Sequence, residues 1–331
     1  MAIKTPFSVE ALKIDCAKET EKICQALRTF VLKQFRKRGV VVALSGGIDS
    51  SVVGAICVRA FGQEQVLGLL MPEKDSAPET PVLGQLITKH LHIPTVYEDI
   101  TGILEAVGCY RRRDEAIKSV VPEYGPNCKC KIVLPGVTDN DKYRIFSVVV
   151  QSPDGRQTRA RLTLPAYLEI VAATNFKQRT RKMLEYYHAD RLNYAVAGTP
   201  NRQEYDQGFF VKLGDGAADV KPIAHLYKTQ VYQMAEFLGV PEEICKRPPT
   251  TDTYSLSQSQ EEFYFSVPYD KFDLCLYGKN HRVSPADVAA TAGMTSEQVE
   301  RVYRDIDAKR NATRYLHTLP LLVEKVVEIS S

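Results

Sequence analysis

Residues 40–61 read VVVALSGGIDSSVVGAICVRAF, and this stretch decides the fold. Its first five residues, Val40–Leu44, are a continuous apolar run of strand length, which is typical of a strand buried on both faces of a sheet. Ser45–Ser50 is expected to form a turn, and Ser51–Phe61 carries an apolar face at helical spacing that ends at Gly62. The stretch therefore predicts a buried strand, a glycine-rich turn and a helix in direct succession.

The same alternation continues along the chain. Apolar runs predict further strands at Val66–Met71, Thr95–Glu98 and Asn193–Gly198. Helical spacing of apolar residues predicts helices at about 11–37, Pro78–His92, about Tyr167–Arg191 and His225–Leu238. Strands that alternate with helices over short connections indicate an α/β fold, with a doubly wound parallel sheet and flanking helices on both faces.

A long segment, roughly Gly108–Pro165, interrupts this alternation. Within it, YRIFSVVVQ and RQTRARLTL flank Ser152–Gly155, a Pro-Asp-Gly turn, and predict an inserted β-hairpin. A connection of this length is usually functional or disordered. We expect one domain over residues 1–265 that carries this insertion. A small helical C-terminal extension over 266–331 is expected to pack on the same domain, with an amphipathic helix at Ser296–Asp305.

Composition limits the class of protein. The chain has 331 residues, 44% of them hydrophobic, which is enough to bury a full core. The apolar runs are too short to cross a bilayer, and Met1–Phe7 has no apolar targeting core, so we expect a cytoplasmic protein. In a chain of this size without a secretory signal, the eight cysteines are expected to be mostly reduced and buried. Cys128 and Cys130 are close together in the sequence but lack the second pair of a structural zinc site.

The charge is unevenly distributed. Residues 109–182 contain fifteen Lys or Arg against seven Asp or Glu, whereas the whole chain has a net charge of only +3. A local basic excess suits phosphate-bearing ligands or nucleic acid, and it is equally compatible with a solvated basic surface.

The turn after the first strand has the chemistry of a phosphate site. Gly46 and Gly47 allow successive backbone N–H groups to point into one concavity, and the following helix adds the positive end of its dipole. Ser45 and Ser50 supply hydroxyl donors, and Asp49 is placed to hold a magnesium ion that bridges phosphates. The loop lacks the Gly-Lys-Ser/Thr ending of the Walker type. The structural alternative is a glycine turn capped by Asp49.

The sequence SGGIDS resembles the signature of the ATP-pyrophosphatase (PP-loop) superfamily, whose members cleave ATP between the α and β phosphates and transfer AMP. Three further segments resemble the NAD synthetase family within it: NFKQRTRKM (Asn175–Met183), GTPNRQEYDQGFFVKLGDGAADVKPIAHLYKTQV (Gly198–Val231) and RPPTTD (Arg247–Asp252). The resemblance covers residues 11–100 and 175–255. It implies a Rossmann-like fold and a carbon–nitrogen ligase of the ammonia-dependent NAD synthetase type.

The resemblance also implies roles for individual residues. The implied ATP contacts are Ser45, Gly46, Gly47, Asp49, Ser50, Thr199, Lys228 and Thr250. Asp49 and Glu204 would share magnesium, and Asp49 and Lys228 would be catalytic, because a cation can neutralise charge on the leaving pyrophosphate. The implied contacts to nicotinic acid adenine dinucleotide are Arg179, Lys212, Asp219 and Lys309.

The implied reaction has two steps: a substrate carboxylate attacks the α-phosphorus of ATP, and ammonia then displaces AMP to give the amide. About forty residues precede the loop, which leaves no room there for a glutaminase domain, so we expect free ammonia or ammonia from a partner. By resemblance we also expect a homodimer. Neither a membrane nor a nucleic acid is favoured as a partner.

Four positions depart from the family pattern: Gln178, Pro200, Ala217 and Ala308. Together with the Gly108–Pro165 insertion, they leave the identity of the carboxylate open. The first alternative is therefore a paralogue that joins ammonia or another amine to a different carboxylate. The second is an RNA-modifying ATP-pyrophosphatase whose basic segment contacts RNA, although the chain has no recognisable RNA-binding module.

Overall fold

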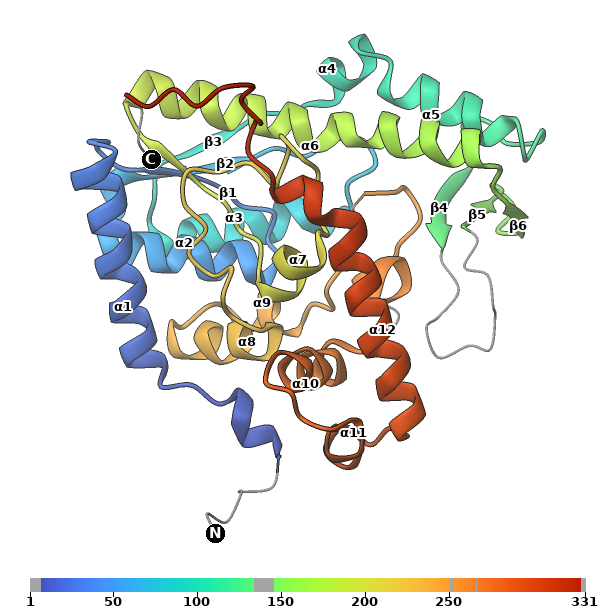
Figure 1. Cartoon of the computed structure of the whole chain (residues 1–331). Helices are drawn as coiled ribbons and strands as arrows, with labels where there is room; N and C mark the ends of the chain where they lie inside the picture. Colours follow the sequence, from blue (N-terminus) through green and yellow to red (C-terminus); the bar gives the residue numbers. More distant parts are fainter. Residues whose placement is uncertain (1–6, 134–145, 251–252, 266, 329–331) are drawn as a thin grey trace.

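The computed structural model describes residues 7–133, 146–250, 253–265 and 267–328. Within them, the central sheet has the strand order β3–β2–β1–β7, and every pairing is parallel (Figure 1). The strands are β1 (Val40–Ala43), β2 (Val66–Leu70), β3 (Thr95–Tyr97) and β7 (Ala195–Ala197). Val40 pairs with both Val66 and Ala195, so β1 lies inside the sheet, as its apolar run predicts.

Helices cover both faces of this sheet. On one face lie α1 (Cys16–Arg28), α2 (Ile48–Phe61), α3 (Glu79–Leu91), α8 (Lys228–Phe237) and α9 (Glu242–Lys246). On the other lie α4 (Thr101–Ala106), α5 (Cys109–Lys118) and α6 (Leu164–Leu192). Val40 and Val42 belong to the first core and Val41 to the second, because alternate side chains of a strand point to opposite faces. The predicted doubly wound α/β fold is confirmed.

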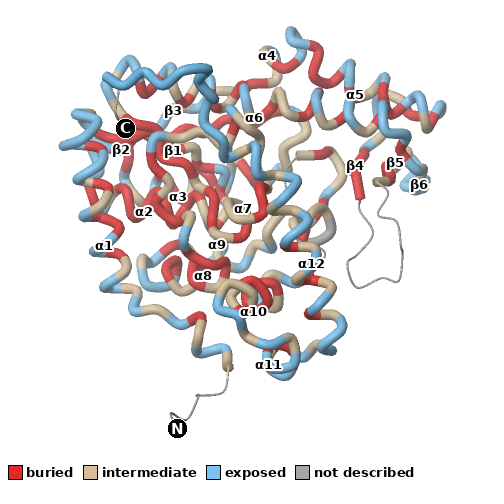
Figure 2. The backbone as a smooth tube through the Cα atoms, viewed as in Figure 1, coloured by how far each residue is buried: buried red, intermediate tan, exposed pale blue. Residues whose placement is uncertain are grey.

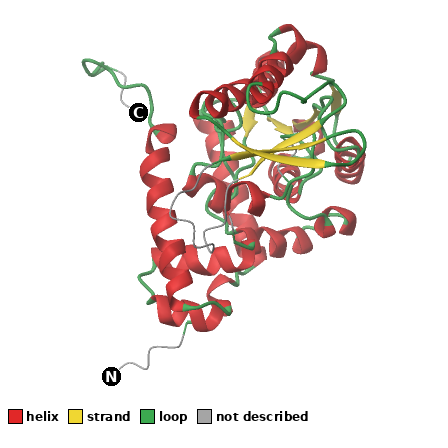
Figure 3. Ribbon diagram, turned by 90° about the vertical axis from the view of Figure 1, so that its right-hand side faces the viewer, coloured by secondary structure: helices red, strands yellow, loops and turns green. Residues whose placement is uncertain are grey.

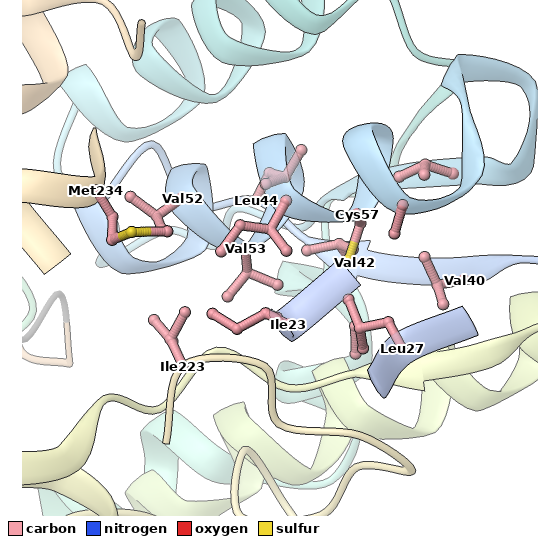
Figure 4. Close-up of a cluster of buried hydrophobic side chains, with 14 of the residues drawn as sticks. Ile23, Leu27, Val40, Val42, Leu44, Val52, Val53, Cys57, Ile223 and Met234 are labelled. Carbon is pink, nitrogen blue, oxygen red and sulfur yellow. The ribbon is translucent and has the colours of Figure 1, made fainter. Parts of the chain in front are cut away.

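The larger core packs side chains from α1 and α2 against β1. Figure 4 shows Ile23 and Leu27 of α1 facing Val52 and Val53 of α2, with Val42 of the strand beside them. All five side chains are at most 4% exposed. Burial of this apolar surface is the main source of free energy that fixes α2, and therefore the loop that precedes it.

The element ends differ from the sequence prediction in a few places. The helix expected at 11–37 begins at Cys16, where the Asp15 side chain accepts a hydrogen bond from the Lys18 backbone, and it continues as a π-helical segment over Thr29–Gln34. Helix α2 begins at Ile48 rather than Ser51, so the turn is shorter than expected. A short 3-10 segment, Val9–Leu12, precedes α1.

The segment that interrupts the alternation contains a second sheet, visible at the right of Figure 1, with the order β4–β5–β6. Strands β5 (Ser147–Gln151) and β6 (Gln157–Arg161) form the predicted antiparallel hairpin. Strand β4 (Lys129–Val133) was not predicted and pairs with β5. Cys130 lies in β4 and is buried, and all eight cysteines are free thiols.

The C-terminal residues form a helical layer below the sheet (Figures 1 and 3). It consists of α10 (Tyr269–Asn280), α11 (Pro285–Ala292), α12 (Ser296–Thr313) and a 3-10 turn at Arg314–His317. Its core includes Leu12 and Tyr227, so it is continuous with the main body through those side chains. The predicted Ser296–Asp305 helix lies within α12. In the described residues, no helix is both long and apolar enough to span a membrane.

Candidate active site

The loop between β1 and α2 is held in one conformation by its glycines and serines. Gly46 has a φ of +72°, and a Cβ there would lie 2.5 Å from the Cβ of Leu83, so α3 packs directly on the loop. The Gly47 backbone N–H donates to the Ser45 Oγ at 3.3 Å, and the Ser50 hydroxyl donates to the Gly47 carbonyl at 3.0 Å. The N-terminus of the 14-residue helix α2 follows at once, so the loop is suited to bind an anion.

A charged pair stands beside this loop. Asp49, in the first turn of α2, forms an ion pair with Lys228, the first residue of α8. The Asn201 side-chain amide donates to the other Asp49 oxygen at 2.9 Å. Lys228 is 1% exposed. Burial alone would lower the pKa of Lys228, but the carboxylates of Asp49 and Glu204 raise it above its ordinary value, so the side chain is a permanent cation.

Glu204 is the second carboxylate of the site. Its Oε2 accepts from the Asn201 backbone N–H at 3.1 Å, and its Oε1 accepts from the Gln260 side chain at 3.1 Å. Burial, followed by the nearby negative charge of Asp49, raises the pKa of Glu204 to about 8. Two carboxylates that disfavour each other's charge in this way form a site for a cation.

The two carboxylates fit magnesium. Mg²⁺ prefers oxygen ligands, and it usually takes one or two carboxylates together with waters and substrate phosphates. Asp49 and Glu204 supply two such groups next to the phosphate loop. Among the described residues, no group of three or more His, Cys, Asp and Glu side chains could hold a metal ion, so the protein itself does not provide a closed metal cage.

A cavity opens at the carboxyl ends of β1, β2 and β7, where a parallel sheet of this kind places its ligands. The lining residues foreseen from the sequence are Ser45, Gly47, Asp49, Ser50, Thr199, Glu204, Lys228 and Thr250. Gly46 lies between two of them in the loop. Arg181, Lys182 and Arg247 also line the cavity with Lys228, and four carboxylates, Asp49, Glu185, Glu204 and Asp215, share its wall with them. Lys182 pairs with Glu185 and Lys228 with Asp49.

The four residues expected to contact the dinucleotide lie elsewhere, and none is among the described residues that line this cavity. The Arg179 Nε donates to the Lys212 carbonyl at 3.3 Å, so these two are neighbours, and Lys212 Nζ donates to the Tyr315 carbonyl at 2.8 Å. Asp219 accepts from the Val196 backbone at 2.7 Å.

Lys309 stands apart from the other three. Its Nζ donates to the Tyr264 carbonyl at 2.7 Å and forms an ion pair with Asp305 at 2.8 Å. The residues expected for ATP are therefore gathered at one place, whereas those expected for the second substrate are distributed over the C-terminal half. Their assignment stays a prediction.

Asn201, Gln260 and Asp273 are among the residues at or beside the site that were missed from the sequence. Asn201 caps α7 (Arg202–Gln207) in a reciprocal capping box with Glu204, and the spacing Asn-x-x-Glu is a signal that could have revealed it. Gln260 and Asp273 carry no such local signal. Asp273, on α10, accepts from the backbone N–H groups of Lys228 and Thr229 at 3.3 and 2.7 Å.

Solved structures share the fold. An NMN synthetase from Francisella tularensis superposes with a TM-score of 0.63 at 20% identity, covering 94% of this chain and 99% of that one. An NH3-dependent NAD synthetase from Campylobacter jejuni gives a TM-score of 0.61 at 22% identity, covering 94% and 100%. At these identities the likeness shows the fold alone.

Sequence relatives are much closer. The NH(3)-dependent NAD(+) synthetase of Mesorhizobium japonicum is 59% identical over 317 residues, 96% of this chain and 99% of that protein. The protein of the same name from Rhizobium meliloti is 59% identical and covers 98% and 96%. One from Thermotoga maritima is 31% identical and covers 89% and 96%. The family model of NAD synthase matches residues 19–123 and 145–314 and leaves 124–144 unmatched.

These matches confirm the resemblance to the NAD synthetases and the class of enzyme, a carbon–nitrogen ligase. None of the relatives described above is named as a nucleic-acid enzyme, so the RNA-modifying alternative gains no support from them. The chain belongs to the NAD synthase family.

Proposed function

We propose that this enzyme converts nicotinic acid adenine dinucleotide to NAD, with ATP and ammonia as co-substrates and AMP and pyrophosphate as products. The pairing of Asp49 with Lys228 beside the glycine loop is the observation that carries the proposal. It puts a carboxylate for a metal and a permanent cation for pyrophosphate at the same phosphate site. The names of the relatives that are 59% identical supply ammonia and the product, NAD(+), and the acid that ammonia would convert to this amide is the proposed second substrate.

In the first step, the substrate carboxylate attacks the α-phosphorus of ATP, and the bond to the β-phosphate oxygen breaks. The loop N–H groups and Lys228 stabilise the negative charge that develops on the pyrophosphate. Thr199 and Thr250 line the same cavity and would position the nucleotide. In the second step, ammonia attacks the acyl carbon of the adenylate, AMP leaves, and the nitrogen loses a proton to give the amide.

Magnesium is proposed as the metal, held by Asp49 and Glu204. It would supply charge neutralisation between the phosphates. The Asn201 side-chain amide donates to Asp49, and the Asn201 backbone N–H donates to the Glu204 carboxylate, while the Asn201 side-chain oxygen accepts from the Glu204 backbone N–H. The protein therefore fixes the distance between the two carboxylates before a nucleotide arrives, which lowers the reorganisation needed during the reaction.

For the dinucleotide we retain Arg179, Lys212, Asp219 and Lys309 as proposed contacts. The Arg179 side chain donates to the Lys212 backbone carbonyl, and an arginine suits a pyrophosphate group. Tyr315 contributes to the same neighbourhood, because Lys212 Nζ lies 5.4 Å from the centre of its ring.

We also propose a homodimer in the cytoplasm. Helix α6 exposes four large side chains, Leu164, Leu168, Met183 and Tyr187, each more than 50% exposed, and Figure 2 shows the exposed side of this helix at the top of the molecule. Exposed apolar residues gathered on one helix mark interaction surfaces. Light scattering on Leu168→Lys and Tyr187→Lys should report monomers, whereas a monomeric wild type would contradict the dimer.

The proposed reaction is tested by pyrophosphate release from ATP, with magnesium and ammonium, in the presence and absence of nicotinic acid adenine dinucleotide. Release that depends on the dinucleotide, with NAD formed in equal amount, is expected. A dinucleotide that a control synthetase consumes but this enzyme ignores would contradict the proposed substrate. Smaller nicotinic acid nucleotides would then be tested as substrates, because the residues that would select the dinucleotide are themselves a proposal.

A further inference from the structure

Residues 247–250 and 253–260 form one wall of the ATP cavity together with the loop behind it. Arg247, Thr250 and Gln260 line it together with two prolines between them. Thr250 and Ser259 form an antiparallel bridge, and the Gln260 backbone N–H donates to the Pro249 carbonyl at 3.2 Å. The lining residues therefore lie at the two ends of a loop that closes on itself, and residues 253–258 lie beyond this closure.

Strand β4 holds these outer residues. The Cys130 backbone N–H donates to the Ser255 hydroxyl at 3.0 Å, and the Cys130 carbonyl accepts from the Leu256 backbone N–H at 3.0 Å. Two residues further along, the Ile132 carbonyl accepts from the Gln258 side chain at 2.5 Å. The free edge of β4, on the side away from β5, is thus covered by the wall of the ATP cavity.

Buried side chains reinforce this contact. Tyr254 is 5% exposed and packs in the same apolar cluster as Cys130 and Ile132. Gln258 is 3% exposed, so its amide is committed to the strand. On the other side, the buried Lys177 of α6 donates to the Thr253 carbonyl at 2.8 Å. The outer loop is therefore fixed between β4 and α6.

Gln260 connects this wall to Glu204 in the site. Its side-chain N–H donates to the Glu204 Oε1 at 3.1 Å, while the other Glu204 oxygen is held by Asn201. Gln260 thus supplies the hydrogen bond that orients the second carboxylate of the proposed metal site. Among the described residues, no other group donates a hydrogen bond to Glu204 Oε1. The orientation of the Glu204 carboxylate therefore depends on the position of the wall.

We propose that strand β4 positions the ATP site by holding residues 253–258 in place through hydrogen bonds. Gln260 is the positioning residue through which strand β4 acts on Glu204. This proposal depends on one part of the proposed function, namely that the cavity binds ATP with magnesium. Strand β4 lies within residues 124–144, the stretch that the family model leaves unmatched, so this device is a feature of the chain's own intervening segment.

The test uses three matched substitutions of glutamine by methionine, which keep the side-chain length and remove the amide. Gln260→Met removes the hydrogen bond to Glu204, and Gln258→Met removes the bond to Ile132. Gln157→Met, at an exposed position of β6, is the control. For each protein, binding of magnesium–ATP is measured by calorimetry, and steady-state turnover is measured with both substrates varied.

A hydrogen bond to a charged group is worth enough to weaken magnesium–ATP binding about tenfold in Gln260→Met, and Gln258→Met should lose about threefold. The KM for the dinucleotide should stay at the wild-type value in both, since its proposed contacts lie elsewhere. Because the two glutamines act in series, the double variant should be no weaker than Gln260→Met alone.

Three results would overturn the proposal: multiplicative losses in the double variant, equal losses in Gln157→Met, or a dinucleotide KM that rises together with the ATP constant. The last would mark a general structural defect. Absence of turnover in the wild type, with magnesium–ATP binding intact and sensitive to Gln260→Met, would refute the proposed reaction and leave the positioning role standing.

Discussion

Asp273 accepts a hydrogen bond from the backbone of Lys228, whose side chain pairs with Asp49 beside the phosphate loop. The C-terminal helical layer therefore caps α8 and fixes the residue proposed to stabilise the leaving pyrophosphate. Burial raises the pKa of Asp273 to about 6, while hydrogen bonds from Thr229, Gln203 and Lys228 limit the rise. At neutral pH the carboxylate is ionised and accepts these bonds.

Replacing Asp273 with asparagine should disturb both stability and turnover. Both Asp273 oxygens accept hydrogen bonds from N–H groups. The asparagine amide would place its NH2 group opposite one of these N–H donors, so the free energy of unfolding should fall by about 1–3 kcal/mol. Turnover should fall as well, because Lys228 moves with its helix end. Urea unfolding and steady-state kinetics measure the two effects.

The control for this prediction is Ser284→Ala, which removes the cap of the distant helix α11. That change should lower the free energy of unfolding by about 1 kcal/mol and leave turnover unchanged. If Asp273→Asn also lost stability without losing turnover, the proposed link from α10 to Lys228 would be wrong.

Asp49→Asn and Lys228→Met should each lower ATP-pyrophosphate exchange by about 10²–10³-fold, the usual effect of removing a preorganised charge that stabilises a transition state. Asp49→Asn keeps the acceptor for Asn201, and its circular dichroism spectrum should match that of the wild type. Exchange at the wild-type rate in either variant would show that the ion pair is structural rather than catalytic.

The magnesium requirement should depend on pH through Glu204. Its raised pKa, about 8, means that the metal-free carboxyl group is protonated below that pH, and a metal ion must displace the proton. The half-saturating magnesium concentration should therefore fall about tenfold for each pH unit from about pH 6.5 to about pH 8, and then level off.

Magnesium titrations of activity at fixed ATP would measure this dependence, with Glu204→Gln as the control, because a glutamine at this position does not titrate. A magnesium requirement that is the same at pH 6.5 and pH 8.5 in the wild type would remove Glu204 from the proposed metal site.

Lys177→Met should strongly destabilise the fold. Lys177 Nζ lies 2.8 Å from both Glu73 and Asp75, and the lysine is 1% exposed. Leaving two buried carboxylates with one cation fewer should lower the free energy of unfolding by about 3–5 kcal/mol. Lys246→Met breaks the exposed pair with Glu242 and should change it by about 0–1 kcal/mol. Equal effects in urea unfolding would contradict this account.

The sequence predicted those strands, helices and turns whose residues show a clear local pattern. The apolar run at Val40–Leu44 forms β1, and the hairpin around Ser152–Gly155 lies as expected, whereas the glycine turn after β1 is shorter than expected. Strand β4 was missed, because its five residues Lys129–Val133 include two lysines and gain their place through pairing with β5 and through contact with Leu256.

Site residues that belong to a sequence motif were predicted, and site residues that only tertiary packing brings to the site were missed. Asp49 and Lys228 are separated by 179 positions, and only the family resemblance linked them in advance. Gln260 and Asp273 reach the site from elements whose docking no local pattern encodes. Because β4 contacts residues 255–258, behind the wall of the proposed ATP cavity, deletion of residues 127–160 should impair ATP cleavage.

The close packing at Gly46 has a consequence for engineering. A side chain at this position would meet the backbone of α3 as well as Leu83, with the Gly84 nitrogen only 2.8 Å from the added Cβ. The loop and the second turn of α3 are therefore packed together as one unit. A graft of this nucleotide site onto another scaffold would have to transfer residues 40–50 together with residues 83–84, or neither would keep its shape.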